Sequence, residues 1–118
     1  MLIVDDSRSI RERLTNALSA LPGLKVVAEA GNGLEALAAI RKHAPDVVTL
    51  DIRMPKVNGL EVLTAIKTAG CKCRVIVLSG FLDEAYRKQC LRLGAADFFD
   101  KVTELDEFYE AMRRLTCH

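Results

Sequence analysis

Five polar residues stand just after short apolar runs, and between them they supply three kinds of chemically active group. Two adjacent carboxylates follow one run, a third carboxylate follows another, a hydroxyl follows a further run, and an ammonium comes after the last. Each group alone has an ordinary explanation, because an aspartate after a strand often forms a turn or caps a helix. The combination is much less expected by chance. The residues are Asp5, Asp6, Asp51, Ser79 and Lys101.

The apolar runs before these residues have the length and composition of buried strands. They are rich in Val, Ile, Leu and Phe, and they do not alternate with polar residues, which suits strands covered on both faces of a parallel sheet. The predicted strands are residues 1–4, 24–28, 47–50, 75–78 and 95–99.

The segments between the runs are predicted helices, because their apolar residues recur at intervals of three and four. Ser9 and Glu12 have the spacing of a capping box near the start of the first helix. Asn58 is the candidate N-cap of the third helix, and Gly70 is its expected C-terminal exit. The fourth helix is expected over residues 83–93.

Five alternations of strand and helix predict an α/β fold, with one doubly wound, five-stranded parallel sheet and helices on both faces. Ligands of such sheets bind beyond the carboxyl ends of the strands, where the strand order reverses. The five polar residues should therefore converge on one edge of the sheet. A chain of 118 residues has room for one core, so we expect a single domain over residues 1–118.

Composition and charge exclude several classes of protein. Apolar residues make up 50% of the chain and charged residues 28%, which excludes a disordered chain. The formal net charge of +1 shows no electrostatic preference for nucleic acid or an anionic membrane. No apolar run reaches the roughly 18 residues of a membrane span, and no signal peptide is visible, so we expect a cytoplasmic location. The cysteines are predicted to be free thiols of a reducing cytosol, because a disulfide framework needs an oxidising compartment and their spacing does not suit a metal site; they are Cys71, Cys73, Cys90 and Cys117.

Three strings of sequence resemble a response-regulator receiver domain, which is the phosphoacceptor module of two-component signalling. They are Leu-Ile-Val-Asp-Asp-Ser at 2–7, Leu-Asp-Ile-Arg-Met-Pro at 50–55, and Gly-Ala-Ala-Asp-Phe-Phe-Asp-Lys at 94–101. The resemblance covers essentially the whole chain. It implies a flavodoxin-like fold with strand order 2-1-3-4-5, which would set the first and third strands side by side.

The resemblance also implies roles for the acidic residues. Asp51 matches the phosphoacceptor, which takes a phosphoryl group from a histidine kinase. Asp6, Asp51 and the backbone carbonyl of Arg53 match the ligands of a Mg²⁺ cofactor, and Asp5 matches an acidic residue that acts through a bound water. Oxygen ligands are what Mg²⁺ prefers. Three carboxylates about 5 Å apart would repel by about 3 kcal/mol per pair at an effective dielectric constant of 20, which a divalent ion would offset.

Three further residues match the parts of the family that respond to phosphorylation. Lys101 matches the charge partner of the phosphoryl oxygens, and Ser79 matches the switch hydroxyl. Phe98 stands where many members have a tyrosine that changes rotamer; it is either such a switch or a simple core or edge aromatic of the fifth strand. The change should reach exposed side chains on the last two helices and strand, namely Tyr86, Arg87, Phe98 and Tyr109.

The chain departs from the family after Lys101, where Val102 replaces the usual proline. The cis bond that usually precedes this proline is not assumed here, because a cis bond before a non-proline residue costs about 3 kcal/mol. The sequence leaves the geometry of the Lys101–Val102 bond open.

Three other functions remain alternatives. A phosphohydrolase of the haloacid-dehalogenase type also forms an aspartyl-phosphate, but it requires Asp-x-Asp, and Arg53 stands two residues after Asp51. A receiver that works without phosphorylation would not need all five polar residues. A nucleotide-binding flavodoxin-like protein would need a glycine-rich or hydroxyl-rich loop after the first strand, where Asp5 and Asp6 stand instead.

The resemblance implies a signalling switch rather than an enzyme with a substrate of its own. The implied partners are a histidine kinase or phosphotransfer protein, and a downstream effector or an attached output domain, with a phosphorylation-dependent homodimer as one form of output. Neither direct binding of nucleic acid by this domain nor contact with a membrane is expected.

Overall fold

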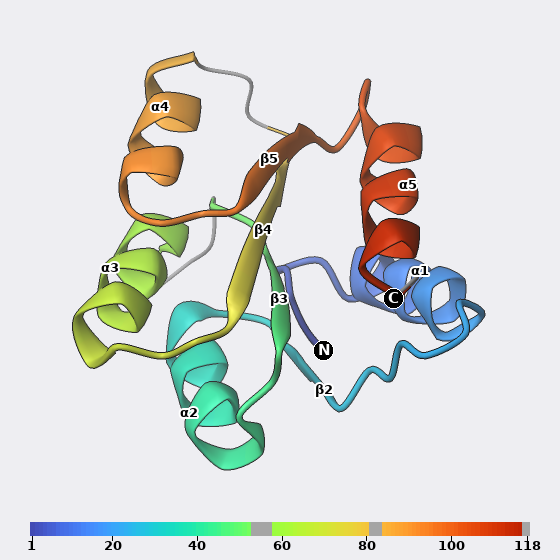
Figure 1. Cartoon of the computed structure of the whole chain (residues 1–118), viewed down its shortest axis with the longest axis horizontal. Coiled ribbons are helices and arrows are strands. Elements are labelled where there is room, and N and C mark those ends of the chain that lie inside the picture. The colour runs from blue at the N-terminus through green and yellow to red at the C-terminus, as the bar shows by residue number, and fades with distance from the viewer. Residues whose placement is uncertain (53–57, 81–83, 117–118) are drawn as a thin grey trace.

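The computed structural model describes residues 1–52, 58–80 and 84–116, in which strands and helices alternate from β1 to α5 (Figure 1). The strands are β1 (Leu2–Val4), β2 (Ala28–Ala30), β3 (Val47–Leu50), β4 (Arg74–Ser79) and β5 (Asp97–Asp100). The helices are α1 (Arg8–Ser19), α2 (Gly33–His43), α3 (Gly59–Ala69), α4 (Glu84–Arg92) and α5 (Leu105–Thr116).

All pairs of neighbouring strands are parallel, and the sheet order β2-β1-β3-β4-β5 confirms the predicted topology. The register aligns Val4 of β1 with Leu50 of β3. Asp5 and Asp51, the next residues along each strand, therefore leave the sheet side by side. Between β4 and β5 the register aligns Ser79 with Asp100, the residue before Lys101.

Helices cover both faces of the sheet, with α2, α3 and α4 on one side and α1 and α5 on the other (Figure 1). Successive residues of a strand point to opposite faces, so the strands contribute side chains to two cores, one on each face of the sheet. Leu2, Val48 and Val77 belong to the core under α2, α3 and α4. Ile3 and Ile76 belong to the core under α1 and α5.

The position predicted for the second strand was wrong. β2 lies at Ala28–Ala30, later in the chain than the predicted range of 24–28. β2 is an edge strand with a single neighbour, and only Ala30 in it is buried. Leu24 and Val26 pack against the core under α1 and α5 before the strand begins, while Val27 is exposed. An apolar run at a sheet edge therefore included residues of the preceding loop.

The fifth strand also begins later than predicted, at Asp97 instead of Ala95. The N–H of Ala95 donates to the carbonyl of Cys90 and so closes α4 rather than pairing with β4. Pairing starts at Ala96, whose N–H donates to Val75.

The predicted capping box at Ser9 was wrong, whereas the predicted ends of the third helix are confirmed. Ser7 is the N-cap of α1, with its side chain accepting from the N–H of Ile10, and Ser9 lies inside the helix. Asn58 accepts from the N–H of Glu61 at the start of α3. Gly70 ends α3 in a left-handed conformation with φ of 69°, which glycine adopts without strain.

Within the described ranges, no helix has both the length and the apolar character needed to span a membrane. Three of the four cysteines lie in these ranges, and they are free thiols as predicted; they are Cys71, Cys73 and Cys90.

Candidate functional site

Three carboxylates meet at the carboxyl edge of β1 and β3. The N–H of Asp5 donates to Ala30 at 3.0 Å and that of Asp51 to Val4 at 3.0 Å, so the sheet ladder extends one residue beyond these strands. Carboxylate oxygens of Asp5, Asp6 and Asp51 lie within 4.8 Å of one another. Asp5 and Asp51 are buried and Asp6 is exposed. The structure therefore brings together the three acidic residues that the sequence singled out.

The two oxygens of Asp5 are both engaged within the protein. Its Oδ1 accepts from the N–H of Ser7 at 2.9 Å, and its Oδ2 accepts from Lys101 Nζ at 2.5 Å. Asp6, in contrast, faces solvent. This arrangement favours Asp6 over Asp5 as a direct ligand of an ion.

The donor set fits a hard divalent cation. The cluster offers oxygen atoms only, and oxygen is the ligand type of Mg²⁺. Oxygens around an octahedral Mg²⁺ lie about 3–4 Å apart, since each is about 2.1 Å from the ion. A cluster with oxygens within 4.8 Å could thus close on the ion with small side-chain movements.

Lys101 lies between two of the carboxylates. Its Nζ is 2.5 Å from Asp5 Oδ2 and 3.2 Å from Asp51 Oδ2, and only 17% of its side chain is exposed. Burial alone would lower the pKa of Lys101, but the hydrogen bond to Asp5 and the charges of Asp51 and Asp5 outweigh burial and raise it. The ammonium therefore stays charged and offsets part of the repulsion within the cluster. The prediction from the sequence makes Lys101 the charge partner of the phosphoryl oxygens and does not include these contacts with Asp5 and Asp51.

Ser79 is fully buried at the carboxyl end of β4, on the same edge as the cluster. Its carbonyl accepts from the N–H of Lys101 at 2.9 Å. The hydroxyl-bearing residue and the lysine are thus joined by a backbone hydrogen bond across the β4–β5 pair.

Phe98 is buried in the core under α2, α3 and α4 with 2% exposure, so its predicted place among exposed side chains was wrong. It faces the core opposite to that of Phe99, because successive residues of a strand point to opposite faces, and the guanidinium of Arg87 in α4 lies over its ring. Tyr86, Arg87 and Tyr109 are half-buried. The predicted rotamer change of Phe98 stays a prediction.

The predicted ligand Arg53 lies outside the described residues, so its role also stays a prediction.

Two residues that the sequence patterns did not single out support the cluster. Arg11 of α1 donates from Nη1 to the carbonyl of Asp5 at 2.7 Å, which orients the peptide unit between Asp5 and Asp6. Gly59, the first residue of α3, lies so close to the chain that follows β3 that a Cβ there would be 2.6 Å from the carbonyl oxygen of Asp51. The glycine directly after the N-cap Asn58 was the available signal for this close approach.

The loop after Lys101 is built without proline. Asp100 Oδ1 accepts from the N–H of Val102 at 2.7 Å and from that of Thr103 at 2.9 Å. A proline at 102 would have no N–H to donate. No peptide bond among the described residues is cis, so the Lys101–Val102 bond, whose geometry the sequence left open, is trans.

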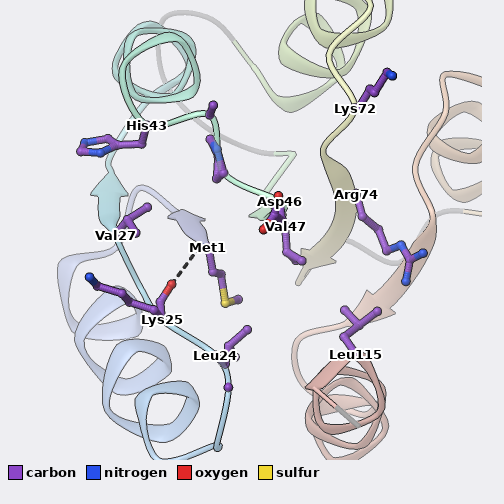
Figure 2. Close-up of a pocket in the computed structure, with 13 residues that line it drawn as sticks. Met1, Leu24, Lys25, Val27, His43, Asp46, Val47, Lys72, Arg74 and Leu115 are labelled. Atoms are coloured by element: carbon purple, nitrogen blue, oxygen red, sulfur yellow. Dashed lines mark hydrogen bonds between the residues drawn. The ribbon is translucent and has the colours of Figure 1, made fainter. Parts of the chain in front are cut away.

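A groove of about 640 Å³ lies at the opposite, amino-terminal edge of the sheet (Figure 2). Met1, Lys25 and Asp46 are among its lining residues, and the amino group of Met1 donates to the carbonyl of Lys25 there. None of the five polar residues at the strand ends lines it. The chemical groups thus gather away from this groove, at the carboxyl edge.

The comparison with protein families agrees with this geometry. The family model of the response regulator receiver domain matches residues 1–113. The chain belongs to this family. The receiver domains are the phosphoacceptor switches of two-component signalling, so the predicted class of function is confirmed, and nothing in the comparisons supports the phosphohydrolase alternative.

Individual receiver relatives differ in how much of their length this chain covers. The chemotaxis protein CheY of Bacillus subtilis is 35% identical over 114 residues, which are 97% of this chain and 94% of CheY. A protein-glutamate methylesterase/protein-glutamine glutaminase of Treponema denticola is 42% identical over 103 residues, which are 86% of this chain and 28% of that relative. This receiver therefore spans less than a third of the methylesterase.

A solved structure resembles the fold closely. In the CheX–CheY–BeF3–Mg complex from Borrelia burgdorferi, the matched chain superposes with a TM-score of 0.87 and 34% identity. The match covers 97% of this receiver and 86% of that chain.

Proposed function

We propose that Asp51 is the phosphoacceptor of this receiver domain, and that residues 1–118 act as one phosphoacceptor unit. The observation that supports the assignment is the position of the Asp51 carboxylate, which lies in the Asp5–Asp6–Asp51 cluster and 3.2 Å from Lys101 Nζ. A histidine kinase or a phosphotransfer protein donates the phosphoryl group.

In the proposed step, a carboxylate oxygen of Asp51 attacks the phosphorus of a phosphohistidine in line. A P–O bond forms as the P–N bond breaks, and the leaving imidazole takes up a proton. The transfer requires mainly positioning and charge stabilisation. Lys101 supplies a positive charge within reach of the incoming phosphoryl oxygens, because it already contacts Asp51.

Asp6, Asp51 and the backbone carbonyl of Arg53 would hold Mg²⁺, with Asp5 acting through a bound water. The ion, when bound, neutralises charge on the phosphoryl oxygens. The engagement of both Asp5 oxygens by Ser7 and Lys101 supports the division of roles between Asp5 and Asp6.

The phosphorylated domain then switches its surface. An aspartyl-phosphate adds negative charge and acceptor oxygens next to Lys101 and near the edge where Ser79 lies. The Ser79 hydroxyl moves toward these oxygens, and Phe98 changes rotamer in response. A downstream effector or an attached output domain reads the new surface, and a phosphorylation-dependent homodimer is one form of that readout. The domain acts in the cytoplasm as a switch and not as an enzyme with its own substrate.

Beryllofluoride, a mimic of the phosphoryl group on an aspartate, tests the assignment. With Mg²⁺ present, the protein should give a bound ¹⁹F resonance and shifted amides around Asp51. Asp51→Asn should abolish both effects. Asp106→Asn is a matched control, since Asp106 is an exposed aspartate of the first turn of α5. A bound resonance that persists in Asp51→Asn would show that another residue takes the mimic.

A further inference from the structure

One glutamate is shared between α4 and the loop that carries Lys101. Glu104 Oε1 accepts from Arg87 Nη2 of α4 at 3.0 Å, and the same oxygen accepts from the backbone N–H of Asp100 at 3.0 Å. Both side chains are about one-third exposed, at 30% and 34%. A partly buried, charge-assisted contact of this kind is stronger than a fully exposed ion pair. The helix and the loop are therefore bound to one carboxylate.

The loop itself holds Lys101 by its flanks. On one side, the Asp100 carboxylate accepts from the N–H groups of Val102 and Thr103. On the other side, Lys101 N–H donates to Ser79. A shift of the Lys101 backbone would therefore act on Asp100, whose own N–H donates to Glu104.

Arg87 also contacts the buried ring of the last strand. Its guanidinium carbon lies 5.1 Å from the centroid of Phe98, within the range of a cation–π contact. A second carboxylate, that of Glu84 on the same helix, lies 3.9 Å from its Nε. The arginine therefore covers Phe98 while it pairs with Glu104, so that α4, the ring and the loop meet at one side chain.

We propose that Arg87 and Glu104 are positioning residues, which form a clasp that orders the Lys101 loop and couples its movement to α4. The coupling half of this proposal rests on the proposed function, because it requires a phosphoryl group on Asp51 that draws on Lys101. A shift of Lys101 moves Asp100 and changes the hydrogen bond from the Asp100 N–H to Glu104. The change at Glu104 then strengthens or weakens its ion pair with Arg87. This route to α4 runs beside the Ser79 hydroxyl and does not depend on it.

Hydrogen exchange in the unphosphorylated protein tests the ordering half. Arg87→Met keeps an apolar stem over Phe98 but removes the charge, and Glu104→Gln keeps an acceptor for Asp100 but removes the ion pair. In each variant, the amides of Asp100, Val102 and Thr103 should exchange about five- to tenfold faster. The double variant should match the single ones, and Arg87→Lys should recover part of the protection. Lys88→Met and Glu107→Gln are matched controls, since both residues are exposed neighbours in α4 and α5.

Exchange in β3 separates the clasp from a general loss of stability, because β3 has no contact with Arg87 or Glu104 among the hydrogen bonds and ion pairs of the described residues. Faster exchange at the loop with unchanged β3 supports the proposal. Equal acceleration at the loop and in β3, or no acceleration at the loop, overturns it.

The beryllofluoride response tests the coupling half. In Arg87→Met and Glu104→Gln, the shift changes of amides 85–92 should fall to less than half of the parent's, while the bound ¹⁹F resonance persists. An undiminished response in α4 overturns the coupling. If the parent itself binds no beryllofluoride, the proposed function fails, and the exchange experiment alone decides for or against the clasp.

Discussion

Lys101 is a counter-ion of the acidic cluster before any phosphoryl group arrives. Its ammonium contacts Asp5 and Asp51 directly, so it occupies part of the negative potential that a metal ion would use. The same residue thus stabilises the fold without the ion and competes with the ion for the carboxylates.

Lys101→Met should therefore bind Mg²⁺ more tightly than the parent, by roughly tenfold, because about 1.4 kcal/mol of competing attraction is removed. Isothermal titration calorimetry measures the affinity, with Lys88→Met as the control for loss of a positive charge at the surface. Weaker Mg²⁺ binding in Lys101→Met would contradict competition at this site.

The buried hydroxyl of Thr49, in the centre of the sheet, lowers the free energy of unfolding. It is buried in β3 between Ile3 and Ile76, and its hydroxyl has no hydrogen-bond partner within the described part of the chain. Thr49→Val keeps the shape and removes the buried hydroxyl, so it should raise the free energy of unfolding by about 1–2 kcal/mol. Urea unfolding measures the change. Thr64→Val, in which an exposed hydroxyl is lost from α3, is the control. A loss of stability in Thr49→Val would mean that the hydroxyl has a favourable role.

The β5–α5 loop departs from the family at Val102, where a proline is usual. Its order comes from the Asp100 carboxylate and two backbone N–H groups. Val102→Pro, although it restores the family's usual residue, should lower the free energy of unfolding by about 1–3 kcal/mol, because Asp100 loses a donor. Val102→Ala should be nearly neutral, since Val102 is 81% exposed. Urea unfolding of both variants checks the difference, and a stabilising proline would contradict this description of the loop.

The same loop should respond to acid. Hydrogen bonds from the N–H groups of Thr103 and Val102 hold the pKa of Asp100 below its ordinary value of 3.8. A lowered pKa in the folded state means that the stabilisation is present above the unfolded value and is lost as the pH falls through the folded one. The stability advantage of the parent over Asp100→Asn should therefore shrink as the pH falls below about 4. Urea unfolding across the acid range measures this difference. If the difference in free energy of unfolding between the parent and Asp100→Asn stays constant through the acid range, Asp100 does not titrate as described.

The elements differ in how well their sequence predicted them. β3 has neighbours on both sides and buried faces, and its apolar run coincides with the strand. β2 has one neighbour, so apolar residues of the preceding loop could extend the run without belonging to the strand. Ser9 has the spacing of an N-cap, but the chain turns into α1 two residues earlier. Ser7, which comes directly after Asp5 and Asp6, therefore caps the helix. Caps and edges depend on local geometry that the residue pattern does not contain.

At the scale of the whole molecule, the parallel order of the strands explains why residues 5, 51 and 101 meet. The pairing of β1 with β3 near the centre of the sheet brings Asp5 beside Asp51. The β4–β5 pair, on the other side of β3, adds Ser79 and Lys101 at the same edge. The sequence predicted this convergence from strand ends alone. It did not predict the Lys101 ion pairs or the Arg87–Glu104 contact, because side-chain partners across a sheet edge depend on distances of a few ångströms.

The most direct test of the central claim is transfer of one phosphoryl group to Asp51. The protein is incubated with Mg²⁺ and a small phosphoryl donor such as phosphoramidate, and its intact mass is measured beside that of Asp51→Asn. The parent should gain the mass of one phosphoryl group, and Asp51→Asn, shown to be folded by its unfolding transition, should gain none. Labelling of Asp51→Asn to the same extent as the parent would contradict the assignment of Asp51 as the phosphoacceptor.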